Sequence, residues 1–315
     1  MKNSTHRFSL SILFLVFLLP GRVLLADQGK STEPDWMKVE TEPSKKSATV
    51  SHEVSTGYSF VAGADMRQGD RDLGKTEEQF ATFNYVASVP VSKGWQLRTG
   101  VSWDRYSFGN TPGAPIPDTL QSTALVLGAD VELSEKWVMR FEIQPGIYSD
   151  FEDIDSGDFD IPMILGFSYI VNKDLQWVFG LIVSPNSEYP VLPGAGVRWQ
   201  FADDWTLNFI LPRPRLEYQV NEQLGVFIGG EIKGGNYRTG SDFGTDVGNP
   251  ALNNAVVSYR EIRAGAGLVY QFHPAVALEA EGGWMVDRLL DYYRADTRVR
   301  GDGAPYAQVG LKAKF

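Results

Sequence analysis

Apolar and polar side chains alternate along most of this chain from Tyr58 onward. In residues 95–103, WQLRTGVSW, one face would carry Trp95, Leu97, Val101 and Trp103 with Thr99, and the other Gln, Arg, Gly and Ser. A period of two predicts β-strands with one apolar and one polar face. Such strands build either the half-exposed sheets of a sandwich or a membrane barrel. The same alternation recurs in residues 125–133, 137–143, 262–272 and 306–315.

The connections between the strands favour the barrel. Short turns alternate with long polar connections, which is typical of outer-membrane barrels with tight turns at one end and long loops at the other. A sandwich would not sort its loops so regularly. The long connections span residues 109–118, 149–158, 233–254 and 287–304. The six short turns, each three residues between two apolar ones, are 92–94, 134–136, 172–174, 202–204, 221–223 and 273–275.

Six turns at the end that also holds both termini imply 2 × (6 + 1) = 14 strands, an even number as expected for bacterial barrels. One pair is short, because residues 205–220 must hold two strands around Pro212-Arg213-Pro214. Tilted spans need about 9–11 residues each. We therefore predict an all-β, transmembrane, antiparallel up-and-down β-barrel of about 14 strands, with 12 strands and a bent rim segment as the alternative.

The first 54 residues differ from the rest. Residues 1–26 combine a basic start, an apolar run and a small-residue end, which is typical of a cleaved signal peptide. An uncleaved membrane anchor is the alternative, but Pro20 interrupts the apolar run. Residues 27–54 are polar and without period, and we predict a flexible periplasmic segment. The barrel would then occupy residues 55–315.

Together, the signal peptide, the sorted loops and the terminal strand YAQVGLKAKF resemble bacterial outer-membrane β-barrels. The segment PRPRLEYQVNEQLGVFIGGEI, residues 212–232, is similar to a family of uncharacterised outer-membrane barrels known only as a domain of unknown function. The resemblance implies a Gram-negative outer-membrane location with periplasmic N- and C-termini. It also implies that Phe315 is an assembly signal. The implied partners are membrane lipids, lipopolysaccharide and the barrel assembly machinery.

Composition narrows the chemistry. The chain has no cysteine, which excludes disulfides, thiolate metal sites and a cysteine nucleophile. A net charge of −10 argues against nucleic acid as a partner. Of three histidines, His6 lies in the signal, His52 in the N-terminal segment and His273 in a short turn, so none suits a hydrolase at the outer rim. Nucleotide-binding and metalloprotease motifs are absent as well, and we expect neither an enzyme nor a cofactor.

The polar face of the strands would line the lumen. These charges predict either a porin-like aqueous pore that filters small solutes or a paired network that fills a narrow barrel. We favour a passive channel for small solutes or lipids, with a closed structural or adhesive barrel as the alternative and an outer-membrane enzyme as the weakest hypothesis. The lumen candidates are Arg98, Asp104, Asp130, Glu132, Arg140, Glu142, Arg198, Glu231, Arg263, Glu279 and Glu281.

Two further groups have candidate roles. Trp95, Trp137 and Trp205 follow short turns and would form an aromatic girdle at that membrane interface. Aromatic residues near the long loops would serve the other interface: Tyr106, Phe108, Tyr148 and Tyr259. The acidic segment 149–158 offers a weak set of possible metal ligands, for which a solvated acidic loop is the favoured alternative: Asp153, Asp155 and Asp158.

Overall fold

The structure, a computed structural model, describes residues 49–109 and 112–315. The predicted signal peptide and residues 27–48 of the predicted flexible segment lie outside the described residues. The sheet contains 17 strands. They are β1 (Ser51–Gln68), β2 (Arg71–Ser92), β3 (Trp95–Phe108), β4 (Thr119–Ser134), β5 (Trp137–Ile143), β6 (Gly146–Ser149), β7 (Phe159–Asp160), β8 (Met163–Ile170), β9 (Leu175–Val183), β10 (Val191–Ala202), β11 (Trp205–Phe209), β12 (Arg215–Gln219), β13 (Leu224–Arg238), β14 (Val256–His273), β15 (Val276–Tyr292), β16 (Thr297–Gly301) and β17 (Ala304–Lys314).

The strands close into one barrel. Strands that are neighbours around the barrel pair in antiparallel fashion, and the last strand, β17, pairs with β1 over Glu53–Val61. Three pairs of short strands, β5 with β6, β7 with β8 and β16 with β17, lie end to end, so the wall has 17 − 3 = 14 strand positions. The prediction of 14 strands is confirmed, and the 12-strand alternative is wrong.

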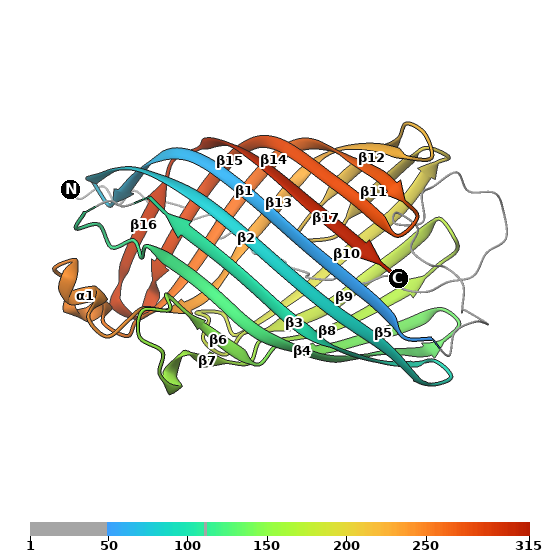
Figure 1. Cartoon of the computed structure of the whole chain (residues 1–315), viewed down its shortest axis with the longest axis horizontal. Helices are drawn as coiled ribbons and strands as arrows, with labels where there is room; N and C mark the ends of the chain where they lie inside the picture. Colours follow the sequence, from blue (N-terminus) through green and yellow to red (C-terminus); the bar gives the residue numbers. More distant parts are fainter. Residues whose placement is uncertain (1–48, 110–111) are drawn as a thin grey trace, which may run out of the picture.

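The two ends of the barrel differ as the turns predicted (Figure 1). All six short turns lie between paired strands at the end that also holds the C-terminus. The opposite end holds the longer connections and the short helical segments η1 (Ser156–Asp158), α1 (Phe243–Asp246), η2 (Pro250–Leu252) and η3 (Tyr293–Ala295). Several strands run further into this end than the sequence predicted. Segments 233–254 and 287–304, predicted as loops, begin or end as strands of β13, β15 and β16.

The outer face of the barrel is apolar. Residues at every second position of the strands expose large hydrophobic side chains, which is the surface that contacts hydrocarbon in a membrane barrel. The three tryptophans of the predicted girdle lie on the outer face at the short-turn end, where Trp95, Trp137 and Trp205 are 49%, 38% and 38% exposed. Other exposed positions include Phe60, Phe83, Leu97, Leu125, Leu127, Phe141, Phe179, Leu181, Ile228, Leu268, Val309 and Leu311.

None of the helices in residues 49–109 and 112–315 is long and apolar enough to cross a bilayer.

The seam of the barrel begins earlier than predicted. Strand β1 starts at Ser51, inside the segment predicted to be flexible up to residue 54. The backbone of His52 exchanges two hydrogen bonds with Phe315, at 2.7 and 3.0 Å. Its ring also bonds the Tyr85 hydroxyl at 2.9 Å. These polar residues form a strand because two neighbouring strands satisfy their backbone, which composition alone does not reveal.

The wall is shortest at the hairpin of β11 and β12. Each of these strands has five residues, against 12 in β10 and 15 in β13 on either side. The chain reverses through residues 210–214, where Pro212 and Pro214 supply no backbone N–H. The predicted bent hairpin is therefore real, although it counts as two strands.

Candidate functional site: the lumen of the barrel

The predicted lumen residues do face inward, and most of them are buried. Asp104 and Asp130 are partly buried, and Glu132 near the short-turn end is exposed. An inward position alone did not predict that the lumen residues would be buried, because an open pore would leave inward side chains in water. The members less than a tenth exposed are Arg98, Arg140, Glu142, Arg198, Glu231, Arg263, Glu279 and Glu281.

A first group of charges joins β3, β4 and β5. Arg140 forms a two-point ion pair with Asp130, with both N–O distances at 2.6 Å. Arg98 lies between two acids, 3.4 Å from Glu142 and 3.9 Å from Asp130. The two cations and two anions balance, so this part of the lumen carries no net charge.

A second group joins the short hairpin to β15. Arg213 and Arg215 each place a guanidinium nitrogen 2.6 Å from Glu279, and 3.4 and 3.1 Å from Glu281. Arg213 also lies 3.1 Å from Glu231 on β13. Sequence reasoning missed both arginines because they belong to the segment read as a turn. The basic residues of PRPR, beside a barrel rich in inward acids, were the available signal.

The third group is the most deeply buried. Glu78, Glu261, Arg263 and Arg288 have side chains that are 0% exposed. Arg263 lies 2.7 Å from Glu261 and 3.3 Å from Glu78, and Arg288 lies 3.0 Å from Glu78. The Tyr259 hydroxyl donates toward both carboxylates. Glu78 and Arg288 were missed because their strands reach further than the alternation indicated.

Aromatic residues fill the long-loop half of the lumen on one side. Tyr106, Phe108 and Tyr259 are 3%, 7% and 3% exposed, so their predicted place at the outer membrane interface is wrong. Tyr148 is partly buried against the same cluster. The reason is strand parity: Tyr106 and Phe108 are an even number of residues from the inward Arg98, and side chains two apart share a face.

This aromatic cluster belongs to one side of the barrel only. Among the described residues, its buried members come from β1–β4, β13–β16, α1, η2 and the connection after β3, and none comes from β5–β12. The members are Met66, Leu73, Phe80, Tyr106, Phe108, Ala114, Ile116, Leu120, Tyr237, Phe243, Leu252, Val257, Tyr259, Leu290, Tyr292 and Val299.

The opposite side of the lumen presents glycines. Gly166 on β8 pairs with Gly180 on β9, which pairs with Gly194 on β10. Residues two positions away on these strands, including Ser168 and Val178, are buried inside the barrel, so the three glycines face inward. Arg140 is the next residue in this row, and its ion pair with Asp130 turns it toward β4. We call Gly166, Gly180 and Gly194 the glycine row.

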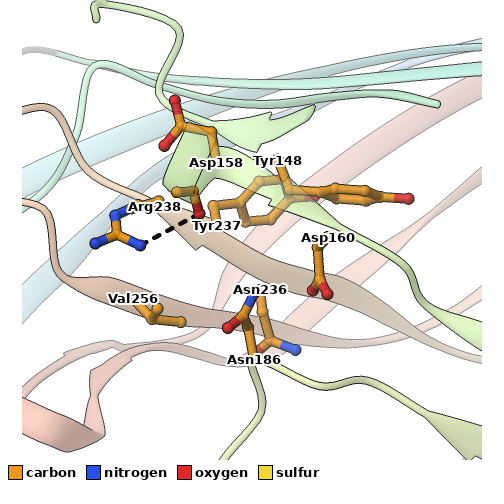
Figure 2. Close-up of a pocket in the computed structure, with 9 residues that line it drawn as sticks. Tyr148, Asp158, Asp160, Asn186, Asn236, Tyr237, Arg238 and Val256 are labelled. Atoms are coloured by element: carbon orange, nitrogen blue, oxygen red, sulfur yellow. Dashed lines mark hydrogen bonds between the residues drawn. The ribbon is translucent and has the colours of Figure 1, made fainter. Parts of the chain in front are cut away.

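The barrel is pinched near the long-loop end. The end of β6 forms a parallel contact with β13, where Arg238 pairs with Ser149. The Asp150 N–H donates to the Arg238 carbonyl at 3.0 Å. Figure 2 shows the small polar pocket at this junction, with Arg238 bonded to the Gly157 carbonyl and with Asp160 and Asn186 beside it. Its volume of about 10 Å³ holds roughly one water molecule.

The acidic segment takes part in this closure. Asp153 accepts a hydrogen bond from the Ser241 hydroxyl at 2.9 Å, and Asp150 accepts one from the Gly240 N–H at 2.5 Å. Asp155 and Asp158 cap the short helix η1. Burial raises the pKa of Asp158 above its ordinary value. Over the described residues, no group of three or more His, Asp and Glu is arranged to hold a metal ion.

Comparisons with known proteins found solved structures of similar chain path and one sequence family. No curated protein matches the sequence. Solved structures with a similar chain path include the COG4313 outer membrane channel from Pseudomonas putida F1, at 10% identity over 86% of this chain and 98% of that chain, with a TM-score of 0.44. The Pseudomonas putida toluene transporter TodX is 11% identical over 83% of this chain and 89% of that one, with a TM-score of 0.38. A Pseudomonas aeruginosa FadL homologue is 11% identical over 84% and 90%, with a TM-score of 0.32. These low scores carry no argument about function.

The sequence family is more informative than the structural likenesses. Residues 50–312 match a single family model, which spans the whole described barrel apart from its last residues. The predicted resemblance to an uncharacterised family of outer-membrane barrels is therefore confirmed. The closed 14-strand barrel with an apolar outer face is of the outer-membrane type, and the chain belongs to DUF6268, a family described as a domain of unknown function.

Proposed function

We propose that this protein is a gated transport barrel of the outer membrane, which passes small solutes along the inner face of β8, β9 and β10. The glycine row is the observation that carries the proposal. The aromatic cluster fills one side of the lumen and ion pairs join several strands around it, while β8, β9 and β10 present three paired glycines. A barrel that served only as a scaffold would gain stability by filling both sides.

The lumen is gated rather than permanently open in this proposal. Its charges are paired with one another, and the contact of β6 with β13 narrows the long-loop end. Small rearrangements of these polar contacts would open a path, whereas an open porin keeps its lumen charges in water. The closed structural barrel remains the second candidate, and the same packing supports it.

Bulky side chains in the glycine row should separate the two candidates. We expect Gly180→Leu and Gly194→Leu to abolish most of the flux of small sugars in a liposome-swelling assay, because the new side chains would fill the space that the glycine row leaves on the inner face of β9 and β10. Gly282→Leu is the matched control, since Gly282 is exposed on the outer face and its added Cβ would meet nothing closer than 3.7 Å. Wild-type protein without flux would support the structural barrel.

We also propose that the long loops face outward and both termini face the periplasm. A peptide tag inserted after Gly248 should be labelled on intact cells, because Gly248 is exposed in the β13–β14 loop with open space around it. A tag after Lys173, in the exposed β8–β9 turn, should be labelled only after the envelope is permeabilised. Labelling in the opposite order would reverse the orientation.

The absence of enzymatic activity is likewise a proposal. Its support is the position of the two histidines in the described residues. His52 is engaged with Tyr85 at the seam, and His273 accepts a hydrogen bond from the Ala275 N–H within the β14–β15 turn. Neither lies near the long-loop end. We propose lipopolysaccharide and the assembly machinery as partners on the strength of the barrel type alone.

A further inference from the structure

The hydrogen-bonded wall is interrupted beside the short hairpin of β11 and β12. Strand β10 pairs with β9 from Val191 to Trp199, but its pairing with β11 begins only at Val197. On the other side, β13 pairs with β12 only as far as Gly229. The Pro214 and Pro212 carbonyls then accept bonds from the N–H groups of Gly230 and Ile232. Within the described chain, the edges of β10 at residues 191–195 and of β13 at residues 233–236 have no strand between them.

The tip of the hairpin fits closely between its neighbours. A Cβ added at Gly196 would lie 2.7 Å from the Phe209 carbonyl oxygen, and one at Gly229 would lie 2.3 Å from the Pro214 carbonyl oxygen. Only glycine allows such an approach without a shift of the backbone. These two glycines therefore allow the tip of the hairpin to lie close against β10 and β13.

A proline lies on the edge of β10 that has no partner strand. The Gln200 N–H donates to the backbone carbonyl of Asp174, the residue before β9. Because N–H directions alternate along a strand, the odd-numbered residues of β10 direct their backbone groups toward β11. Pro193, which has no N–H, therefore stands on the unpaired edge. The unpaired edge therefore has one fewer backbone N–H group without a hydrogen-bond acceptor.

The interruption lies at the rim of the apolar belt. On β9, the residues paired with Ala195 and Pro193 are Phe179 and Leu181, whose side chains are 41% and 38% exposed on the outer face. On the β13 side, Gly234 pairs with Arg260, which forms a 3.0 Å ion pair with Asp287. The interruption therefore has two borders: the β10 border is apolar on its outer face, and the β13 border is charged. Backbone edges at this level must contact water, a solute or another chain, because hydrocarbon cannot satisfy them.

The same interruption adjoins the glycine row. Gly194 is the last member of the row, and it lies on β10 within the unpaired stretch. A solute that passed along the glycine row on the inner faces of β8, β9 and β10 would reach the unpaired edge of β10. The proposed path inside the barrel and the interruption of its wall are thus continuous.

Polar contacts above the interruption link the β9–β10 connection and η1 to β13 and η3. The Asn236 side-chain amide donates to the Ser184 hydroxyl at 2.9 Å, and Arg238 donates to the Gly157 carbonyl at 3.2 Å. Tyr293 donates to the Asn186 carbonyl at 3.1 Å. Asn186 and Asn236 both line the small polar pocket in Figure 2. A few single hydrogen bonds hold two segments together less firmly than the continuous backbone ladder of paired strands, so this closure is easily opened.

We propose that the interruption between β10 and β13 is a lateral portal, through which small apolar or amphipathic molecules pass between the lumen and the membrane. The proposal rests on the proposed transport function and names its substrate class. The apolar border at Phe179 and Leu181 would contact the hydrocarbon part of such a molecule. The Arg260–Asp287 pair and the Asn236–Ser184 contact would meet its polar end.

Cross-linking the two borders tests the portal directly. The chain contains no cysteine, so Ser184→Cys with Asn236→Cys introduces one reactive pair, to be joined by a short reducible thiol cross-linker. We expect the cross-linked protein to lose most of its influx of N-phenyl-1-naphthylamine, an apolar dye, in whole cells, and to regain it on reduction. The matched control joins Arg67→Cys to Asp302→Cys, an exposed ion pair at 3.1 Å that links β1 to the β16–β17 turn.

A second measurement keeps the portal and the transport function distinguishable. A nitroxide at Ala195→Cys should be reached both by oxygen and by a water-soluble nickel chelate, whereas one at Ala266→Cys should be reached by oxygen alone. Both alanines are exposed on the outer face, but the backbone of Ala266 is paired with a strand on each side.

Two results would overturn the portal and leave transport standing. One is equal accessibility of the two nitroxides, and the other is cross-linking that leaves intact a dye influx that Gly180→Leu does abolish. Spin–spin broadening at Ala195 would also overturn it, since that edge would then pair with a second copy. Absence of dye influx in the wild type would overturn the portal, and absence of both dye influx and sugar flux would overturn both proposals.

Discussion

Replacing Arg263 by methionine should lower the free energy of unfolding of the barrel by about 3–5 kcal/mol, because it leaves two carboxylates buried around one remaining cation. Arg263 holds Glu261 at 2.7 Å and Glu78 at 3.3 Å, and all three side chains are fully buried. It also donates to the Ser59 hydroxyl at 3.0 Å. These partners lie on β14, β2 and β1, so the loss would loosen contacts across the lumen as well as along one strand.

Urea unfolding of protein folded in lipid vesicles would measure this change. The matched control is Arg67→Met, which breaks the ion pair with Asp302 at the surface, where the two side chains are 57% and 56% exposed. Exposed pairs contribute about 0–1 kcal/mol, so the control should unfold almost as the wild type does. An equally small effect of Arg263→Met would mean that water enters the lumen and solvates the carboxylates.

A double variant sharpens the interpretation. Glu261→Gln together with Arg263→Met removes one anion and one cation, and the third group then retains Glu78 with Arg288 at 3.0 Å. We expect the double variant to be less destabilised than the sum of the two single variants, because contacting charges do not act independently. Simple additivity would show that Arg263 and Glu261 contribute to stability independently of each other.

Local periodicity accounts for what could be predicted of the fold. The side chains of a strand alternate between two faces whatever the strand pairs with, so the outward position of Leu97 and the inward position of Arg98 follow from the sequence alone. The short turns also predicted strand number, because each one fixes a pair of antiparallel neighbours. The same parity placed Tyr106 inside the barrel. The prediction failed there because an aromatic residue near a loop was assigned to the membrane interface without regard to its face.

The contacts across the lumen could not be predicted in this way. Glu78 on β2 meets Arg288 on β15 only because the barrel closes, and no local pattern encodes that approach. The contact of Ser149 with Arg238 likewise depends on how far the long-loop end is narrowed. Whether a row of inward charges forms an open pore or a packed network depends on these distances, which is why the sequence left both alternatives open.

Removing the phenyl ring of Phe315 should deplete the folded barrel from the outer membrane almost as severely as deleting the residue. Its side chain is 66% exposed, so the ring contributes little packing to the folded barrel. Its backbone, in contrast, completes the seam through the two hydrogen bonds to His52. Phe315→Ala keeps the backbone and removes only the ring, so it separates a signal that is read during assembly from a structural contact.

Membrane fractionation and the heat-dependent mobility of the folded barrel on gels would measure the outcome. Phe272→Ala is the matched control, because Phe272 is 58% exposed at the same end of the barrel but lies inside the chain. We expect Phe272→Ala to assemble normally, Phe315→Ala to leave mostly unfolded or degraded protein, and deletion of Phe315 to behave like Phe315→Ala. If only the deletion failed, the seam between His52 and the last residue would be what assembly requires, since Phe315→Ala retains both of those hydrogen bonds.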